Sequence, residues 1–233
     1  MHNVTYESTQ GQVSVNNFIR SVYNWMGIGL ALTGFVAFFV ASSPAMLNII
    51  FGTPLIFLLI IAEFGMVYFL AARVHKMEAS TATGVFLLYA ALNGATLSSI
   101  FIRYTMASIA STFFICAATF IACSIYGMVT RRDLTSVGSF FFMGLIGIVI
   151  ASVINLFLQS SAMAAIISYI GVIVFVGLTA YDTQKLKVMA FSQPDGLDAG
   201  VVQKGAISGA LTLYLDFINM FIMLLHIFGM GDD

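Results

Sequence analysis

The chain has 233 residues, of which 60% are hydrophobic and only 8% are charged, and its formal net charge at pH 7 is −1. A soluble domain carries roughly 25% charged residues, so this composition excludes a water-soluble globule. It also excludes intrinsic disorder, which needs low hydrophobicity, and the near-neutral charge offers no basic face for nucleic acid. The sequence therefore predicts one membrane domain with the lipid bilayer as its surroundings.

Seven apolar runs, each close to the length that crosses a bilayer, follow one another along the chain. They are Val22–Ser43, Thr53–Val74, Thr81–Ile102, Met106–Val129, Ser136–Leu158, Ala162–Tyr181 and Ala206–Phe228. The runs are apolar on all sides, whereas the strands of a membrane barrel alternate in polarity. The predicted fold class is an all-α integral membrane protein with seven transmembrane helices.

The segments between and before these runs are polar. Residues 1–17 are expected to form a polar cytoplasmic N-terminal tail, followed by a single seven-helix domain over residues 18–233. The connections are short except for Thr183–Gly205, which contains Pro194, Asp195 and Gly196. An ordinary disordered terminus and a tail that engages a partner are both compatible with the composition of residues 1–17.

The basic residues predict the orientation. With seven spans, eight of the nine Lys and Arg residues fall on one side of the membrane, and only Arg103 falls on the other. The eight are Arg20, Arg73, Lys76, Arg131, Arg132, Lys185, Lys187 and Lys204. Because basic residues collect on the cytoplasmic side, the N-terminus is predicted to be cytoplasmic and the acidic C-terminus (Asp232, Asp233) to be outside.

Charged residues inside the apolar runs are the main functional signal, because a charge in lipid is costly. Asp216 is expected about ten residues into the seventh span, about 15 Å deep at a rise of 1.5 Å per residue. Asp182 and Arg73 are expected at the cytoplasmic ends of the sixth and second spans. Two neighbouring carboxyl groups cannot both ionise at low cost, and an adjacent arginine favours the ionised form. The trio can therefore act as a proton-sensitive switch, although Asp216 could instead be a neutral group that ties two helices together.

Two further polar residues are candidates for lining an ion pathway. Asn219 lies three residues after Asp216, on the same face of a helix. Glu63 lies in the middle of the second span, where it could line the pathway or bond to a neighbouring helix. Asp182 and Asp216 are also the candidate ligands for transient calcium, whereas no catalytic residue and no cofactor are expected.

Two aspartate motifs carry a family resemblance. The sixth span ends in Tyr181-Asp182-Thr183-Gln184, and the seventh contains the run Leu213-Tyr214-Leu215-Asp216-Phe217-Ile218-Asn219. The sequence resembles the Bax inhibitor-1 (transmembrane Bax inhibitor motif) family in its compact bacterial form, over about residues 18–229. Arg73 matches only by its place at the end of the second span.

The resemblance implies a fold in which the seventh helix is central and the other six surround it. It implies a pH-sensitive, calcium-permeable leak channel of the bacterial plasma (inner) membrane. In this interpretation Asp182, Asp216 and Arg73 form a latch that is closed when both carboxyl groups are ionised and loosened by protonation. Calcium ions and protons are then the expected partners.

Other functions remain as alternatives. Some bacterial relatives are described as modulators of a membrane-bound ATP-dependent protease, so a modulator without transport of its own is the main alternative. An intramembrane aspartyl protease is disfavoured because Leu213-Tyr214-Leu215 stands where that class has Gly-x-Gly before the aspartate. A secondary transporter is disfavoured because paired, broken helices in corresponding halves are not evident. The chain is therefore expected not to be an enzyme.

Overall fold

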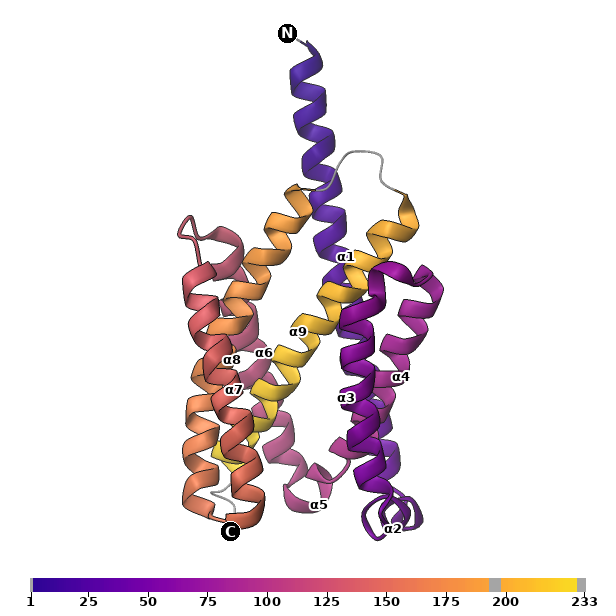
Figure 1. Ribbon diagram of the computed structural model, residues 1–233, viewed down its shortest axis with the longest axis vertical. Helices are drawn as coiled ribbons and strands as arrows, with labels where there is room; N and C mark the ends of the chain where they lie inside the picture. The colour runs from indigo at the N-terminus through magenta and orange to yellow at the C-terminus, as the bar shows by residue number, and fades with distance from the viewer. Residues whose placement is uncertain (1, 193–197, 230–233) are drawn as a thin grey trace. The chain divides into compact units, whose positions relative to one another are not determined.

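The protein is helical throughout the part of the chain that the structure describes (Figure 1). This computed structural model describes residues 2–192 and 198–229, with side chains from Val15 onward. Its elements are α1 (His2–Ala41), α2 (Pro44–Phe51), α3 (Leu55–Arg73), the 3₁₀ turn η1 (Val74–Lys76), α4 (Ala79–Leu97), α5 (Ile100–Arg103), α6 (Met106–Val129), α7 (Thr135–Leu158), α8 (Ser161–Phe191) and α9 (Ala199–Phe228). Of the turn and C-terminal residues singled out above, Pro194, Asp195, Gly196, Asp232 and Asp233 lie outside the described residues.

Within that part of the chain, seven helical stretches are long and apolar enough to cross a membrane. They are Val15–Ala41, Leu55–Lys76, Ala79–Arg103, Met106–Val129, Thr135–Leu158, Ser161–Phe191 and Ala199–Phe228. The predicted all-α class and the seven spans are confirmed. The fourth span has the predicted bounds, and the second, third and fifth differ from the predicted ones by no more than three residues at either end.

Short polar side chains set where several helices begin. Thr105 precedes α6 and its hydroxyl accepts a hydrogen bond from the Ser108 amide at 3.1 Å. Asp198 precedes α9 and accepts from the Gly200 amide at 2.7 Å. Because the first amides of a helix have no partner within it, such caps define its start.

The predicted long connection Thr183–Gly205 is wrong. Helix α8 continues to Phe191 and α9 begins already at Ala199. The segment after Asp182 alternates charged and apolar residues at helical spacing, and it buries Leu186 and Ala190. Hydropathy alone ends the span at the first charges, whereas the amphipathic helix goes on. Asp182 consequently lies inside α8 rather than at its end, and Asp216 lies near the middle of α9.

The first helix also starts earlier than expected. Helix α1 begins at His2, so the backbone of the predicted tail is helical from that residue on. The stretch that is long and apolar enough to cross a membrane is Val15–Ala41, and Val15 and Phe18 within it are buried.

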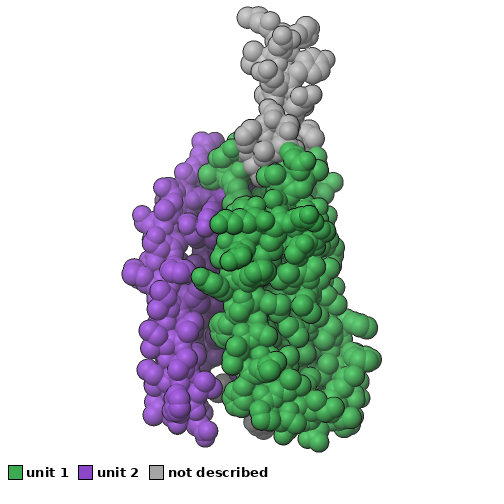
Figure 2. Space-filling view, turned by 45° about the vertical axis from the view of Figure 1, so that its right-hand side comes forward, with its two compact units in different colours: residues 1–103, 188–214 green, residues 104–187, 215–233 purple. Residues whose placement is uncertain are grey.

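Two compact units divide the chain, and they are coloured separately in Figure 2. Unit 1 contains Met1–Arg103 and Val188–Tyr214, and unit 2 contains Tyr104–Lys187 and Leu215–Asp233. Helix α9 contributes to both, and 56% of its most apolar stretch is buried, against 6% for α3 and α7. Helix α9 is thus the most buried of the seven stretches, and the central position predicted for the seventh span stays a prediction.

Close helix contacts within each unit depend on glycine. In unit 1, α1 and α4 pack along each other, and a Cβ on Gly94 would lie 2.6 Å from the Thr33 carbonyl oxygen. In unit 2, a Cβ on Gly127 would meet the Ala180 carbonyl oxygen, which brings α6 and α8 equally close. Small residues allow helix backbones to approach in lipid, where tight packing drives association.

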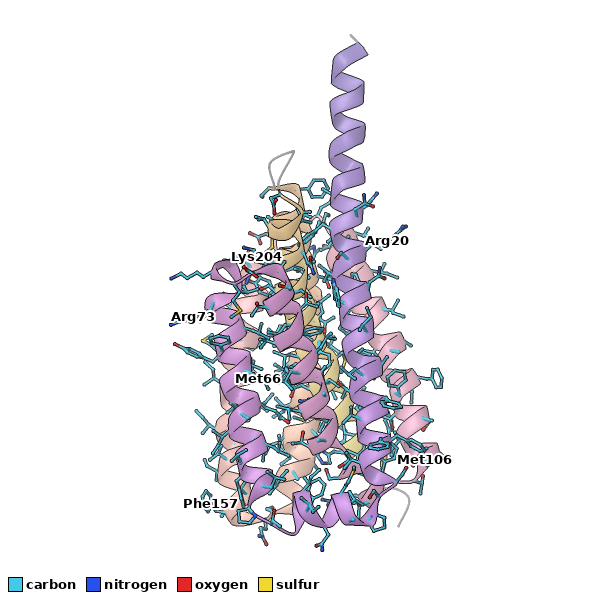
Figure 3. All side chains as sticks on the ribbon, turned by 90° about the vertical axis from the view of Figure 1, so that its right-hand side faces the viewer. Arg20, Met66, Arg73, Met106, Phe157 and Lys204 are labelled. Carbon is cyan, nitrogen blue, oxygen red and sulfur yellow. The ribbon has the colours of Figure 1, made fainter. Side chains whose placement is uncertain are left out.

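Three basic residues of unit 1 lie toward one end of it. Figure 3 shows Arg20, Arg73 and Lys204 above Met66, toward the end of the view from which α1 begins. Lys204 also donates a hydrogen bond to the His75 carbonyl at 3.2 Å. The orientation predicted from the basic residues stays a prediction.

Candidate functional site

The two motif aspartates come together in unit 2. Asp182 on α8 is half-buried, and Asp216 on α9 is only 5% exposed. Their carboxyl groups are in side-chain hydrogen-bonding contact. Burial of both helices brings the pair together, although 34 positions separate the residues in sequence.

One oxygen of this pair lacks a partner. Oδ2 of Asp216 is buried and has no hydrogen-bond partner among the described residues. Buried polar atoms are normally hydrogen-bonded, and an exception calls for a physical explanation. A proton or a nearby cation would neutralise the charge of a carboxyl group in this position, where an isolated charge is costly.

The surroundings of the pair contain few charges. Lys185, one turn after Asp182 on α8, interacts electrostatically with that aspartate. From α6, the Cys116 thiol donates to the Phe217 carbonyl at 3.7 Å, next to Asp216 in sequence. Thr183 donates to the Ser124 hydroxyl at 3.5 Å, which links α8 to α6. The contacts named here therefore bring one ammonium group and otherwise neutral groups to the carboxyl pair.

Arg73 belongs to unit 1, where it is exposed at the end of α3. The two aspartates belong to unit 2. The predicted bridge between the arginine and the carboxyl groups stays a prediction.

Glu63 bonds to a neighbouring helix, which was one of its two predicted roles. Its Oε1 accepts a hydrogen bond from the Thr96 hydroxyl at 2.8 Å, and this ties α3 to α4 within unit 1. Asn219 turns its amide back to its own helix, donating to the Leu215 carbonyl at 2.8 Å. Neither contact joins these residues to the aspartate pair, so their pathway-lining roles stay predictions.

Calcium contact is the expected metal chemistry of the carboxyl pair. Among residues 2–192 and 198–229, no group of three or more His, Cys, Asp or Glu side chains is placed to hold a metal ion. Calcium takes about six to eight oxygen ligands, and two carboxyl groups supply at most four oxygens. The transient calcium contact expected of Asp182 and Asp216 stays a prediction.

Two structural residues near the site carry no signal in the hydropathy pattern. The Gln184 amide accepts from the Leu134 amide at 2.9 Å and donates to the Arg132 carbonyl at 2.8 Å. Lys187 donates to the Met128 carbonyl at 2.6 Å. Both belong to the part of α8 that was expected to be loop. The helical spacing of Thr183, Leu186 and Ala190 is the signal that could have revealed it.

A third residue that the sequence prediction missed is Tyr214, in unit 1, whose hydroxyl lies 2.7 Å from the Thr33 hydroxyl. It belongs to the motif that contains Asp216. A tyrosine in a central span needs a hydrogen-bond partner when it is buried, and that requirement was the available signal.

Comparison with known proteins agrees with the family resemblance found in the sequence. A family model described as "Inhibitor of apoptosis-promoting Bax1" matches residues 15–233. "Inner membrane protein YbhL" of Escherichia coli K12 is 53% identical over 222 residues, which cover 94% of each chain. Protein RP147 of Rickettsia prowazekii is 44% identical over 219 residues, which cover 94% of this chain and 92% of that protein. A protein of Borreliella burgdorferi is 43% identical over 215 residues, which cover 92% of each chain. The chain therefore belongs to the Bax inhibitor-1 family.

Proposed function

We propose that the protein is a calcium-permeable leak pathway of the bacterial inner membrane whose permeability rises as the pH falls. The observation that carries the proposal is the contact between Asp182 and Asp216 inside two membrane-length helices. The name of the Escherichia coli relative supports the inner membrane. The N-terminus is proposed to be cytoplasmic because of the eight-to-one distribution of basic residues.

Protonation is the proposed control. When both carboxyl groups are ionised, they attract a cation strongly, and the family resemblance implies Arg73 as that cation. Taking up one proton leaves a single charge on the pair and allows an O–H···O hydrogen bond between the two groups. The attraction for the arginine falls, and the latch loosens. Lys185 lies one turn after Asp182 on the same helix and interacts electrostatically with it, so it contributes positive charge next to the pair.

Calcium is the proposed permeant ion because of the chemistry of the pair. Calcium is a hard cation that prefers carboxylate and carbonyl oxygens. Asp216 offers an oxygen without a partner among the described residues. The role proposed for these residues is transport, and it requires no catalysis.

Calcium entry into liposomes tests the proposal. The purified protein is reconstituted around a calcium-sensitive dye, and entry is followed across about pH 5.5 to 8, because the protons of a coupled pair come off in separate macroscopic steps. Wild type is expected to conduct faster at low pH. Asp216→Asn and Asp182→Asn are expected to lose the pH dependence, because an amide cannot change its charge.

The matched control is Glu78→Gln, an equally conservative change at a position whose side chain makes no capping bond to α4. It is expected to behave as wild type. Arg73→Gln tests the arginine separately, and it should raise calcium entry at high pH. An unchanged pH profile in folded Asp216→Asn, or no calcium entry at any pH, would overturn the proposal.

A further inference from the structure

Three helices of unit 1 meet in a buried hydrogen-bonded junction. The Thr33 hydroxyl on α1 donates to the Ala90 carbonyl on α4 at 2.8 Å. It lies 2.7 Å from the Tyr214 hydroxyl on α9. A threonine hydroxyl has one proton to donate, and Ala90 receives it, so Tyr214 must be the donor to Thr33. Every partner in this chain of bonds is therefore determined.

The junction is packed so closely that Tyr214 has little freedom. Its side chain is fully buried, and Thr33 is 3% exposed. The rings of Phe86 and Tyr89 lie edge-on to the Tyr214 ring, with centroids 5.9 and 5.8 Å away. A Cβ on Gly29 would lie 2.7 Å from Phe86 and 3.3 Å from Tyr214. Close packing of this kind holds a side chain in one rotamer.

A fixed Tyr214 also fixes the rotation of α9 about its own axis. Helix α9 is continuous from Ala199 to Phe228, so it contains both Tyr214 and Asp216. At 3.6 residues per turn, positions i and i+2 point about 200° apart, and side-chain ends lie about 5–6 Å from the axis. A rotation of about 20° would therefore move the Asp216 carboxyl group by about 2 Å. An O–H···O bond has its partners about 2.5–3.0 Å apart, so this rotation would separate the carboxyl pair.

We propose that Tyr214 is a positioning residue for Asp216, and that its hydrogen bond to Thr33 holds α9 in the rotation that presents Asp216 to Asp182. The functional meaning of this role rests on the proposed function, whereas the positional effect does not. The positioning role is assigned to the hydroxyl group of Tyr214 and not to its ring.

The titratable and charged groups around both residues must be considered in any pH measurement. Asp216 faces Asp182 on α8, with Lys185 beside that aspartate, and α6 contributes the neutral Cys116 thiol nearby. Tyr214 has Tyr89 and Glu63 within electrostatic reach. The test therefore uses changes that remove a hydroxyl group and leave all carboxyl and ammonium groups in place.

Tyr214→Phe keeps the ring and removes the hydroxyl, and Thr33→Val removes the acceptor. Each is expected to shift the pH midpoint of calcium entry by about half a unit or more, the size expected when a hydrogen bond that holds one protonation state is lost. Thr33→Ser keeps a hydroxyl and should restore the wild-type midpoint. The matched control is Tyr89→Phe, which removes a hydroxyl from the same aromatic cluster. The Tyr89 hydroxyl accepts a hydrogen bond from the Asn93 amide on its own helix at 3.4 Å and does not join two helices. It should leave the midpoint unchanged.

A second readout does not depend on transport. The infrared carboxyl band of protonated Asp216, assigned by its loss in Asp216→Asn, reports the protonation of this residue directly. Tyr214→Phe is expected to shift the titration of this band, and Tyr89→Phe is not.

The outcomes separate the two proposals. If calcium entry has no pH dependence but the infrared titration shifts in Tyr214→Phe, the proposed function fails and the positioning role stands. If Asp216→Asn abolishes the pH dependence while Tyr214→Phe matches wild type in both readouts, the positioning role fails alone. An equal shift in Tyr89→Phe would also overturn it, because the effect would then belong to the cluster in general.

Discussion

Helix α9 places one buried polar side chain in each unit, and the two have different surroundings. In unit 1, the Tyr214 hydroxyl lies in a chain of bonds with Thr33 and Ala90, and each of these bonds is shorter than 3 Å. In unit 2, Asp216 meets another carboxyl group, and its Oδ2 has no partner among the described residues. A fully satisfied polar network makes a protein interior rigid, whereas a buried polar group without a partner is energetically costly. We infer that α9 is anchored in one unit and responsive in the other.

A similar comparison applies to the backbone contacts. Gly94 in unit 1 and Gly127 in unit 2 both face a carbonyl oxygen of another helix, so neither position has room for a methyl group. Close backbone contact is therefore present in both units, and the difference compared here lies in their buried polar side chains.

The largest effect on stability is expected for Gly127→Ala. The new Cβ would meet the Ala180 carbonyl oxygen, and a backbone atom cannot move aside as a flexible side chain can. Overpacking of this kind costs about 1–3 kcal/mol. Thermal unfolding in detergent should show a clear fall in Tm for this variant and for Gly94→Ala.

Gly27→Ala is the matched control, because apart from its chain neighbours and the nearby backbone of its own helix no atom lies within 4 Å of the new Cβ. It should leave Tm unchanged or raise it, since alanine favours a helix over glycine by about 1 kcal/mol. Equal falls in Tm for all three variants would contradict the close packing described for α1 with α4 and for α6 with α8.

The next effect is expected at the unit 1 junction. Thr33→Val leaves the buried Tyr214 hydroxyl without its acceptor, which costs about 1–2 kcal/mol. Tyr214→Phe in the Thr33→Val background should then cost little more, because both partners of the bond are gone. A double-mutant cycle of unfolding free energies measures the coupling, and strictly additive costs would rule out the bond.

Loss of the two hydrogen bonds between Gln184 and the turn that joins α6 to α7 should have a smaller effect on stability. Gln184→Ala removes both bonds to that turn, at Leu134 and Arg132. A loss of about 1 kcal/mol corresponds to a roughly five-fold increase in local opening. Limited trypsin digestion after Arg131 and Arg132 should accelerate by about that factor.

Gln203→Ala is the control for this digestion. Gln203 bonds to Thr83 at 3.1 Å within unit 1, far from the turn in sequence. Its loss should leave cleavage at Arg131 and Arg132 as in wild type, and an increase of similar size would mean that the digestion reports overall stability instead.

The spans are predictable from the sequence because length and apolarity determine them. The fourth span, Met106–Val129, has the predicted bounds, since uncharged residues fill it and Thr105 caps it. The end of α8 was not predictable by hydropathy, because Lys185 and Lys187 interrupt the apolar run while the helix continues. Charged residues there face partners such as the Met128 carbonyl, which only the tertiary structure reveals.

The candidate site was predictable in part for a related reason. The cost of a carboxyl group in a span is enough to single out Asp216 and Asp182 from the amino-acid sequence. The same reasoning could not separate the two roles of Glu63, because its partner Thr96 lies on another helix. Hydrogen bonds between helices depend on rotation and register, and single-sequence patterns do not determine either.

The smallest effect concerns an exposed carboxylate, which sharpens the contrast with the buried pair. Asp133 precedes α7 and accepts from the Thr135 hydroxyl at 2.6 Å and from the Thr135 amide at 2.9 Å. These bonds favour the ionised form, so they hold the pKa of Asp133 below its usual value. A lowered folded-state pKa means that the stabilisation is present above the unfolded-state pKa and is lost as the pH falls through the folded-state pKa.

Thr135→Val should therefore move the Asp133 titration to higher pH, as followed by carboxyl NMR with Asp133→Asn for assignment. Thr119→Val removes a hydroxyl that bonds to the Ile115 carbonyl of α6, and it should leave that titration unchanged. If Thr135→Val also left it unchanged, the hydroxyl bond would not be the source of the shift, and the backbone amide would be the remaining donor.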